Sequence, residues 1–326
     1  MGNFSSTENN RFPLKIRKTK KYGWIPDIPD QRDISTSFPN TINSLDSVDL
    51  RKTGYLPEIY DQGFQGSCVA QAVIAAYIFD LSKADLLTFT PSRQFVYYNQ
   101  RVISNMVEYD TGSSIRDAIK VINRLGVCSE DLCIYDSNFF TNDRPSDEAY
   151  ADAIKHQRTI QYRKIRLVLD DVLKSISIKI PIIFGFTVYE SFEHPDVTRT
   201  GIMPMPKLGE KIVGNLAVLA IGYDIPRKFL LCRNAWGTAW GQLGYFWMPF
   251  SFLNSRNCSD LWIISSGAKE KVRSEVRHEP KEVRHETKEH VISLKETPRK
   301  ESIIEKVPAF KDDDSIEEID EDDTAV

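Results

Sequence analysis

The residues best suited to covalent chemistry are grouped in the segment DQGFQGSCVAQAVIAAY, which begins at Asp61. Cys68 follows a glycine-containing turn and begins an apolar run at helical spacing, without Gly or Pro, through residue 82. The thiolate is the nucleophilic form of cysteine, and the positive N-terminal end of a helix favours it. Gln62 can place its side-chain amide beside the Cys68 backbone N–H as an oxyanion donor. The segment therefore predicts a thiol nucleophile for acyl transfer.

An isolated cysteine on an apolar helix would ordinarily be an inert core residue. The Gln and Gly residues around Cys68 favour the nucleophile instead. We also expect the helix N-terminus by itself to keep the thiol reactive toward electrophiles.

The elements that must position this segment fall into two groups along the chain. Helical periodicity marks residues 68–82 and 114–125, and the second run stops at Gly126. Short β-rich runs bounded by Gly, Pro, Asp or Asn follow at 180–189, 214–224, 228–236 and 244–250. This segregation predicts an α+β fold with a helical half and a sheet or barrel half that meet at a cleft. Before both, GWIPDIPDQRD (23–33) mixes Trp24 and Ile25 with turn-forming prolines and predicts a packed, extended arm.

The motif Q-G-x-x-G-S-C at Gln62–Cys68, followed by an apolar helix, resembles the active-site segment of the papain family of cysteine proteases. LTFTPSRQFVYYNQR (87–101), TGSSIRDAIKVINRLGVCSEDLCIY (111–135), NLAVLAIGYD and CRNAWGTAWGQLGYFWM are similar to later family segments, in the same order. The resemblance covers residues 23–267 and implies a two-lobed papain-like fold. In it the helical left lobe spans about 55–160, the β-barrel right lobe spans about 160–267, and the active-site cleft lies between them.

The resemblance also implies roles for single residues. Cys68 would be the nucleophile, Gln62 the oxyanion donor and Asn234 the residue that orients the general base. Trp236 would shield the hydrogen bond between Asn234 and the base, and Gly112 and Ser113 would line the bound peptide.

The general base is where this chain departs from the family. The base stands in a strand of pattern G-x-H-A-V, and this chain reads Gly214-Asn215-Leu216-Ala217-Val218 there, so Leu216 replaces the imidazole. Without an imidazolium, the thiol loses its ion-pair partner and the acid that protonates the leaving amine. His194 is the candidate substitute base, because its loop runs near the leaving-group side in relatives.

Three functions stay open, so whether the protein is an enzyme stays open as well. The favoured one is a papain-type homologue that binds extended peptides without hydrolysing them. The second is an active cysteine endopeptidase with an unconventional base such as His194. The third is a membrane-tethered interaction protein whose termini carry the function.

The composition of the chain limits which classes of binding partner and which cellular compartment we expect. The formal net charge is −4 and the acidity is concentrated after residue 268, so the folded part gives no reason to expect nucleic acid as a partner. Five cysteines without disulfide spacing, and no secretory signal or apolar membrane span, predict an intracellular, non-secreted protein. For a viral source this would be the virion or the infected-cell cytoplasm. We expect no cofactor and no metal, because no complete ligand set stands out.

The two ends of the chain carry signals of their own. Residues 1–22 form a polar leader in which Gly2 and Ser6 fit a myristoylation pattern, and the basic residues 15–21 would face anionic lipid; an ordinary disordered leader is the alternative. No long helical segment precedes residue 23, so we expect no control by pro-segment removal. Residues 268–326 form a charged tail that we expect to be disordered, with Thr324-Ala325-Val326 as a candidate ligand for a tail-binding protein partner.

Overall fold

The computed structural model describes residues 22–33, 35–39, 41, 45–254 and 256–266. All described residues belong to one unit of the chain, Met1–Lys271. The predictions for Gly2, for residues 15–21 and for the charged tail lie outside the described residues. All that follows concerns this unit.

Six α-helices are described. They are α1 Cys68–Lys83, α2 Arg93–Ile103, α3 Ile115–Leu125, α4 Asp147–Lys155, α5 Leu169–Ser177 and α6 Pro195–Thr200. Short 3-10 turns occupy Leu50–Thr53, Glu130–Leu132, Glu190–Glu193 and Phe250–Phe252.

The strands form a single mixed sheet. They are β1 Ser35–Thr36, β2 Ser47–Asp49, β3 Gln161–Ile165, β4 Ile182–Tyr189, β5 Ile212–Asp224, β6 Phe229–Arg233, β7 Tyr245–Pro249 and β8 Cys258–Ser265. Their order is β1-β3-β8-β4-β5-β6-β7, and β2 pairs separately with β5. Every pairing is antiparallel except that of β1 with β3.

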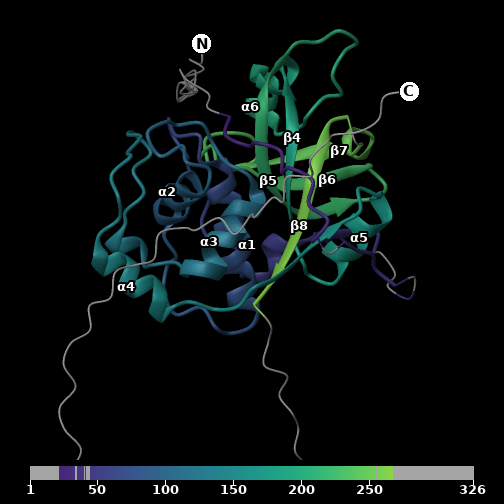
Figure 1. The fold of residues 1–326 in the computed structure, drawn as a ribbon. Helices are drawn as coiled ribbons and strands as arrows, with labels where there is room; N and C mark the ends of the chain where they lie inside the picture. The colour runs from purple at the N-terminus through teal and green to yellow at the C-terminus, as the bar shows by residue number, and fades with distance from the viewer. Residues whose placement is uncertain (1–21, 34, 40, 42–44, 255, 267–326) are drawn as a thin grey trace, which may run out of the picture. The chain divides into compact units, whose positions relative to one another are not determined.

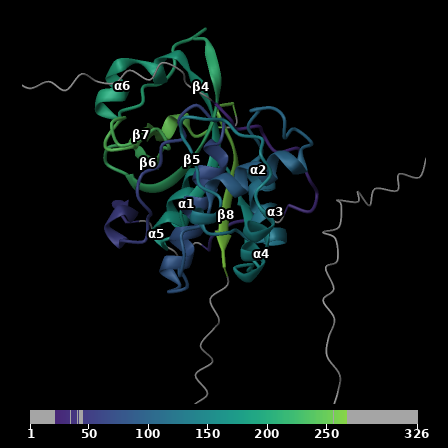
Figure 2. The ribbon, with the colours of Figure 1, turned by 90° about the vertical axis from the view of Figure 1, so that its left-hand side faces the viewer.

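Helix α1 is the core of the helical lobe. Its residues from Cys68 to Phe79 are all buried, so it is apolar around its whole circumference. Figures 1 and 2 show α2, α3 and α4 on one side of α1 and strands β4 to β7 on the other. The helix thus lies against both lobes, and its first residue, Cys68, lies where they meet.

The predicted boundaries of α3 are confirmed, and local capping explains them. The Ser114 side chain accepts a hydrogen bond from the Asp117 backbone N–H, which satisfies a donor of the first turn. Gly126 ends the helix with a φ of 75°, a conformation that side chains disfavour. Gly112 and Ser113 directly precede the Ser114 cap, so they lie just before the first turn of the helix.

Strand β5 is the centre of the strand lobe, because it pairs with β2, β4 and β6. Antiparallel pairing with β4 sets Leu216 opposite Phe186 and Ala217 opposite Gly185.

The predicted segregation of helices before strands holds only in part, since β1 and β2 precede α1 and the helices α5 and α6 lie among the later strands. Strands of two and three residues are too short to show alternation in the sequence.

Among the described residues, no helix combines the length and apolar character that crossing a membrane demands.

Candidate active site

Cys68 is fully buried at the first position of α1. Its Sγ lies 3.5 Å from the backbone nitrogen of Ala217 on β5, so the predicted nucleophile does lie at the junction of the two lobes. The backbone N–H groups of Ala217, Gly23 and Val69 all face the sulfur. Gly23 belongs to the N-terminal arm, so the arm covers the thiol.

The environment of Cys68 favours the neutral thiol. Burial raises its pKa to about 11, and the surrounding backbone N–H groups offset only part of this effect. Thiolate is therefore a minor species near neutral pH. This environment works against the predicted activation of the sulfur by the helix N-terminus, because removal from water outweighs the effect of the backbone N–H groups on the pKa.

Gln62, the predicted oxyanion donor, is fully buried in the loop that precedes α1. Its side-chain nitrogen donates to Gln65 O at 2.7 Å, and its side-chain oxygen accepts from the indole N–H of Trp236 at 3.2 Å. Its backbone N–H donates to Ala235 O at 2.8 Å. These bonds join the loop before α1 to the segment after β6, so Gln62 also connects the two lobes.

Leu216 occupies the position that the resemblance assigns to the base. It is fully buried on β5 and directly precedes Ala217, whose nitrogen contacts the Cys68 sulfur. A leucine side chain neither accepts nor releases a proton, so this position offers no acid–base chemistry.

Asn234, the predicted base-orienting residue, is buried and only partly satisfied. Its side-chain oxygen accepts from the Ala235 backbone N–H at 2.8 Å, whereas its side-chain nitrogen is buried without a hydrogen-bond partner. Buried amide donors are nearly always paired. Asn234 and Cys68 both line a cavity of about 10 Å³.

Trp236 belongs to an aromatic cluster rather than to an open surface. Its ring lies 5.1 Å from that of Trp240, 5.7 Å from that of Phe192 and 6.1 Å from that of Tyr22, centroid to centroid. Edge-on aromatic contacts of this kind stabilise a core. Trp236 therefore has a packing role that does not depend on catalysis.

The two histidines of the described chain are engaged elsewhere. His194 is 63% exposed, and its Nδ1 accepts from the Asp196 backbone N–H at 3.2 Å at the start of α6. His156 stacks on Phe89 with ring centroids 3.8 Å apart. Neither is among the groups that face the buried Cys68 sulfur.

Gly112 and Ser113, predicted to line a bound peptide, contact the chain's own arm. The Ser113 N–H donates to Gly23 O at 2.8 Å, and the Ile25 N–H donates back to Ser113 O at 3.0 Å. On the opposite side the Trp24 N–H donates to Asn215 O at 3.3 Å. We call the space between Ser113 and Asn215 the cleft; residues 22–25 fill it.

This occupancy confirms the predicted extended arm, but no pattern in the sequence indicated where the arm would lie. A hydrogen bond between residues 24 and 215 depends on tertiary structure alone. The one local signal was Gly23, a residue without a side chain next to a large aromatic one.

Comparison with known proteins agrees with this geometry. The family model described as "Papain family cysteine protease" matches residues 45–260, more than half of the chain. The chain belongs to the papain family. This family membership confirms the predicted papain-like α+β fold.

Three relatives illustrate the range of papain-family similarity. An uncharacterized peptidase C1-like protein of Acanthamoeba polyphaga mimivirus is 39% identical over 76% of this chain and 87% of its own length. The crystal structure of xylellain, a cysteine protease from Xylella fastidiosa, is 35% identical with a TM-score of 0.70, and the match covers 78% of this chain and 99% of that one. Cathepsin K of Gallus gallus is 29% identical over 61% of this chain and 57% of its own length.

Within the part of the chain that the structure describes, no group of three or more His, Cys, Asp or Glu residues is arranged to hold a metal ion.

Proposed function

We propose that this papain-family homologue holds extended peptide segments in its cleft without hydrolysing them. The observation that carries the proposal is the surroundings of the Cys68 sulfur. Backbone N–H groups face it, its pKa is raised to about 11, and the residue at the base position is Leu216. A neutral thiol without a proton acceptor is a poor nucleophile.

Peptide binding is supported by the segment that already fills the cleft. Residues 23–25 are extended and form backbone hydrogen bonds to Ser113 on one wall and to Asn215 on the other. Addition of an extended segment to exposed backbone groups is a general mode of peptide recognition. The walls thus offer backbone partners that any extended peptide could use.

An active endopeptidase that relies on His194 is not favoured. The imidazole is mostly exposed and caps α6, whereas proton transfer from the thiol needs contact at about 2.6–3.2 Å. The membrane-tethered function depends on Gly2 and on residues 15–21. It stays a prediction from the sequence, as do the tail-binding partner and the intracellular location.

The test is a hydrolysis assay of the full-length protein with a mixed peptide library, analysed by mass spectrometry. We expect the wild type and the Cys68→Ala variant to give the same peptide pattern, with no cleavage that depends on Cys68. His194→Ala should match the wild type. Cleavage that requires Cys68 would refute the proposal, and its loss in His194→Ala would identify the base.

A further inference from the structure

Two thiols of the helical lobe, those of Cys128 and Cys133, contact each other through a hydrogen bond between their side chains. Cys128 is fully buried, whereas Cys133 is partly exposed. The next residue, Ile134, is 71% exposed, so the chain reaches the surface at Cys133. The pair therefore combines one sulfur in the core with one that a small molecule can approach.

The backbone holds the two cysteines together around a single residue, Ser92. The Ser92 backbone N–H donates to Cys128 O at 2.9 Å, and the Ser92 hydroxyl donates to Cys133 O at 2.5 Å. Between the cysteines, the 3-10 turn Glu130–Leu132 reverses the chain, and the Cys133 N–H closes it by donating to Glu130 O at 3.2 Å. The two residues thus lie side by side with their sulfurs in contact, which is the arrangement that a disulfide requires.

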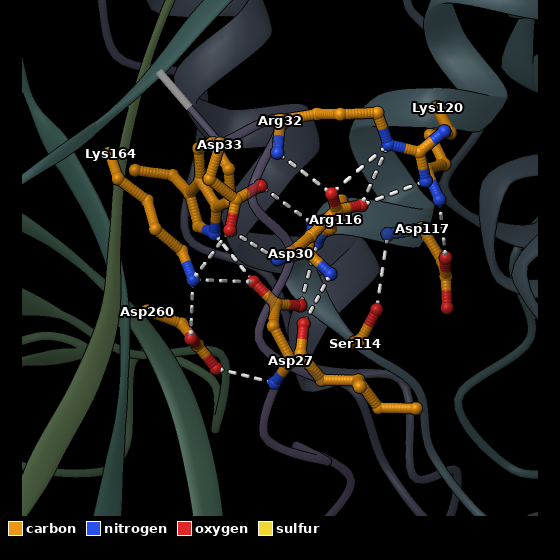
Figure 3. Close-up of polar contacts among 12 residues, drawn as sticks. Asp27, Asp30, Arg32, Asp33, Ser114, Arg116, Asp117, Lys120, Lys164 and Asp260 are labelled. Carbon is orange, nitrogen blue, oxygen red and sulfur yellow. Dashed lines mark hydrogen bonds and ion pairs between the residues drawn. The ribbon is translucent and has the colours of Figure 1, made fainter. Parts of the chain in front are cut away.

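Cys128 belongs to a fixed part of the fold, because helix α3 ends at Leu125, three residues before it. Figure 3 shows how the start of this helix is held. The Arg116 backbone N–H donates to Asp27 at 3.1 Å, and Arg116 Nε donates to Asp33 at 3.1 Å. The small shift that closes a disulfide therefore falls on the short turn that carries Cys133, and not on α3.

The contact makes the two sulfurs chemically unequal. The hydrogen bond from Cys128 lowers the pKa of Cys133, whereas the same bond, together with burial, raises the pKa of Cys128. The partly exposed sulfur is thus the better thiolate, and the buried one keeps its proton. An accessible low-pKa thiol next to a second thiol is typical of an attacking and a resolving cysteine.

The other two buried cysteines provide a contrast. Cys232 on β6 and Cys258 on β8 interact with each other, and burial raises both pKa values. Both residues are at most 2% exposed. A small molecule can therefore reach the Cys128–Cys133 pair but not this one.

We propose that Cys128 and Cys133 form a thiol–disulfide exchange site that reacts with small disulfides of the glutathione class. The Cys133 thiolate attacks one sulfur of such a disulfide, whose S–S bond breaks, and one glutathione leaves as a thiolate. Cys128 then attacks Cys133 Sγ in the mixed disulfide, the second glutathione leaves, and the Cys128 proton passes to a released thiolate. The two cysteines are oxidised by two electrons, and the small disulfide is reduced to two thiols.

The first step prepares the second. The hydrogen bond to Cys133 is the largest cause of the raised pKa of Cys128. In the mixed disulfide Cys133 carries no negative charge, so the Cys128 thiol gives up its proton more easily.

The exchange site lies close to the loop that precedes Cys68. Tyr135 follows Cys133 by two residues, and its hydroxyl donates to Gln62 O at 2.8 Å and lies 2.5 Å from Ser67 Oγ. A disulfide therefore fixes the turn next to a residue that supports this loop.

The test treats full-length, reduced protein with oxidised glutathione at pH 8 under native conditions. Iodoacetamide then blocks the remaining free thiols after denaturation, and mass spectrometry of digested protein identifies the state of each cysteine. The matched variants are Cys128→Ser, which lacks the resolving thiol, and Cys133→Ser, which lacks the attacking one. Circular dichroism checks that each variant is folded.

We expect the wild type to form a disulfide between Cys128 and Cys133 that dithiothreitol reverses, with no lasting glutathione. Cys128→Ser should keep one glutathione on Cys133. In Cys133→Ser, glutathione should be attached to Cys128 at least about tenfold more slowly, because the remaining thiol is buried and protonated. Cys232 and Cys258 should stay free in all three proteins.

Folded wild type that forms no disulfide with excess oxidised glutathione would overturn the proposal. A lasting glutathione on Cys133 of the wild type would also overturn it, since Cys128 would then not resolve the mixed disulfide. Equal oxidation of Cys232 and Cys258 would show that the reaction occurs in unfolded chains, and so would refute the site. If Cys128→Ser unfolds, Cys128→Ala replaces it, with the same glutathione expected on Cys133.

Discussion

The helical wall and the strand wall of the cleft differ in how completely they retain a catalytic arrangement. On the helical wall, Cys68 begins α1 and Gln62 has hydrogen-bond partners for both of its side-chain polar atoms. On the strand wall, Leu216 stands at the base position and the Asn234 side-chain nitrogen is buried without a partner.

The difference shows which parts of a catalytic site also serve the fold. Gln62 joins the two lobes and Trp236 packs in an aromatic cluster, so both contribute to stability without any chemistry. The base position contributes only by filling space, and leucine fills it well. Under the proposed non-hydrolytic function, these residues would stay useful to the fold without catalysis.

Restoring an imidazole on the strand wall should have the largest effect. The background is Gly23→Ala, because a Cβ atom at Gly23 would lie 1.7 Å from Gly66 O and the arm could not keep its place over Cys68. In that background, Leu216→His should raise Cys68-dependent peptide hydrolysis by at least about 10²-fold, the lower end of what a positioned acid–base group contributes. Initial rates on a mixed peptide library measure it. Leu216→Gln is the control, because it adds polarity without a group that titrates; equal rates for the two variants would contradict the assignment of this position.

The second effect concerns the thiol on the helical wall. Below both pKa values, a thiol with pKa about 11 has roughly 100-fold less thiolate than one at the ordinary value of 9.0. Iodoacetamide modification of Cys68 in the wild type should therefore be slow at pH 8 and rise about tenfold per pH unit toward pH 11.

Cys133 supplies the internal control for this measurement. It is partly exposed, and a hydrogen bond from the Cys128 thiol lowers its pKa. Mass spectrometry of digested protein should show Cys133 modified before Cys68 at pH 8. The reverse order would mean that Cys68 is activated after all.

The smallest expected effect is on the free energy of unfolding, when the side-chain amides of Gln62 and Asn234 are removed in turn. Gln62→Ala removes two hydrogen bonds and leaves the Trp236 indole N–H unpaired, so it should lower the free energy of unfolding by about 2 kcal/mol. Asn234→Ala also removes a buried donor that has no partner, so its loss should stay below about 1 kcal/mol. Urea unfolding of both variants measures the difference, and a larger loss for Asn234→Ala would show that its amide is satisfied in solution.

Local pattern accounts for most of the correct fold predictions. The apolar run at 68–82 matches α1, and the run at 114–125 matches α3 within a residue because Ser114 and Gly126 cap it. The four predicted strands correspond to β4, β5, β6 and β7. The short strands β1 and β2 were missed, since two or three residues carry no periodicity. The longer strands β3 and β8 were not predicted either.

The candidate site also contains features that local pattern could predict and features that it could not. Motif and resemblance predicted roles for the site residues Cys68, Gln62, Leu216, Asn234, Gly112 and Ser113. The structure places Cys68, Gln62 and Asn234 at the junction of the lobes. The state of the thiol could not be predicted, because a pKa depends on burial by residues distant in sequence.

The sequence by itself determined the family and several of the helical and strand segments, and it predicted Cys68 as the nucleophile with Leu216 at the base position. Those features depend on residue types and on short spacings along the chain. Only the tertiary structure decided that the arm fills the cleft, that Cys68 is buried under Gly23, and that Asn234 keeps an unpaired donor. Each of these depends on backbone groups far apart in the chain meeting at distances of a few ångströms, which no local pattern encodes.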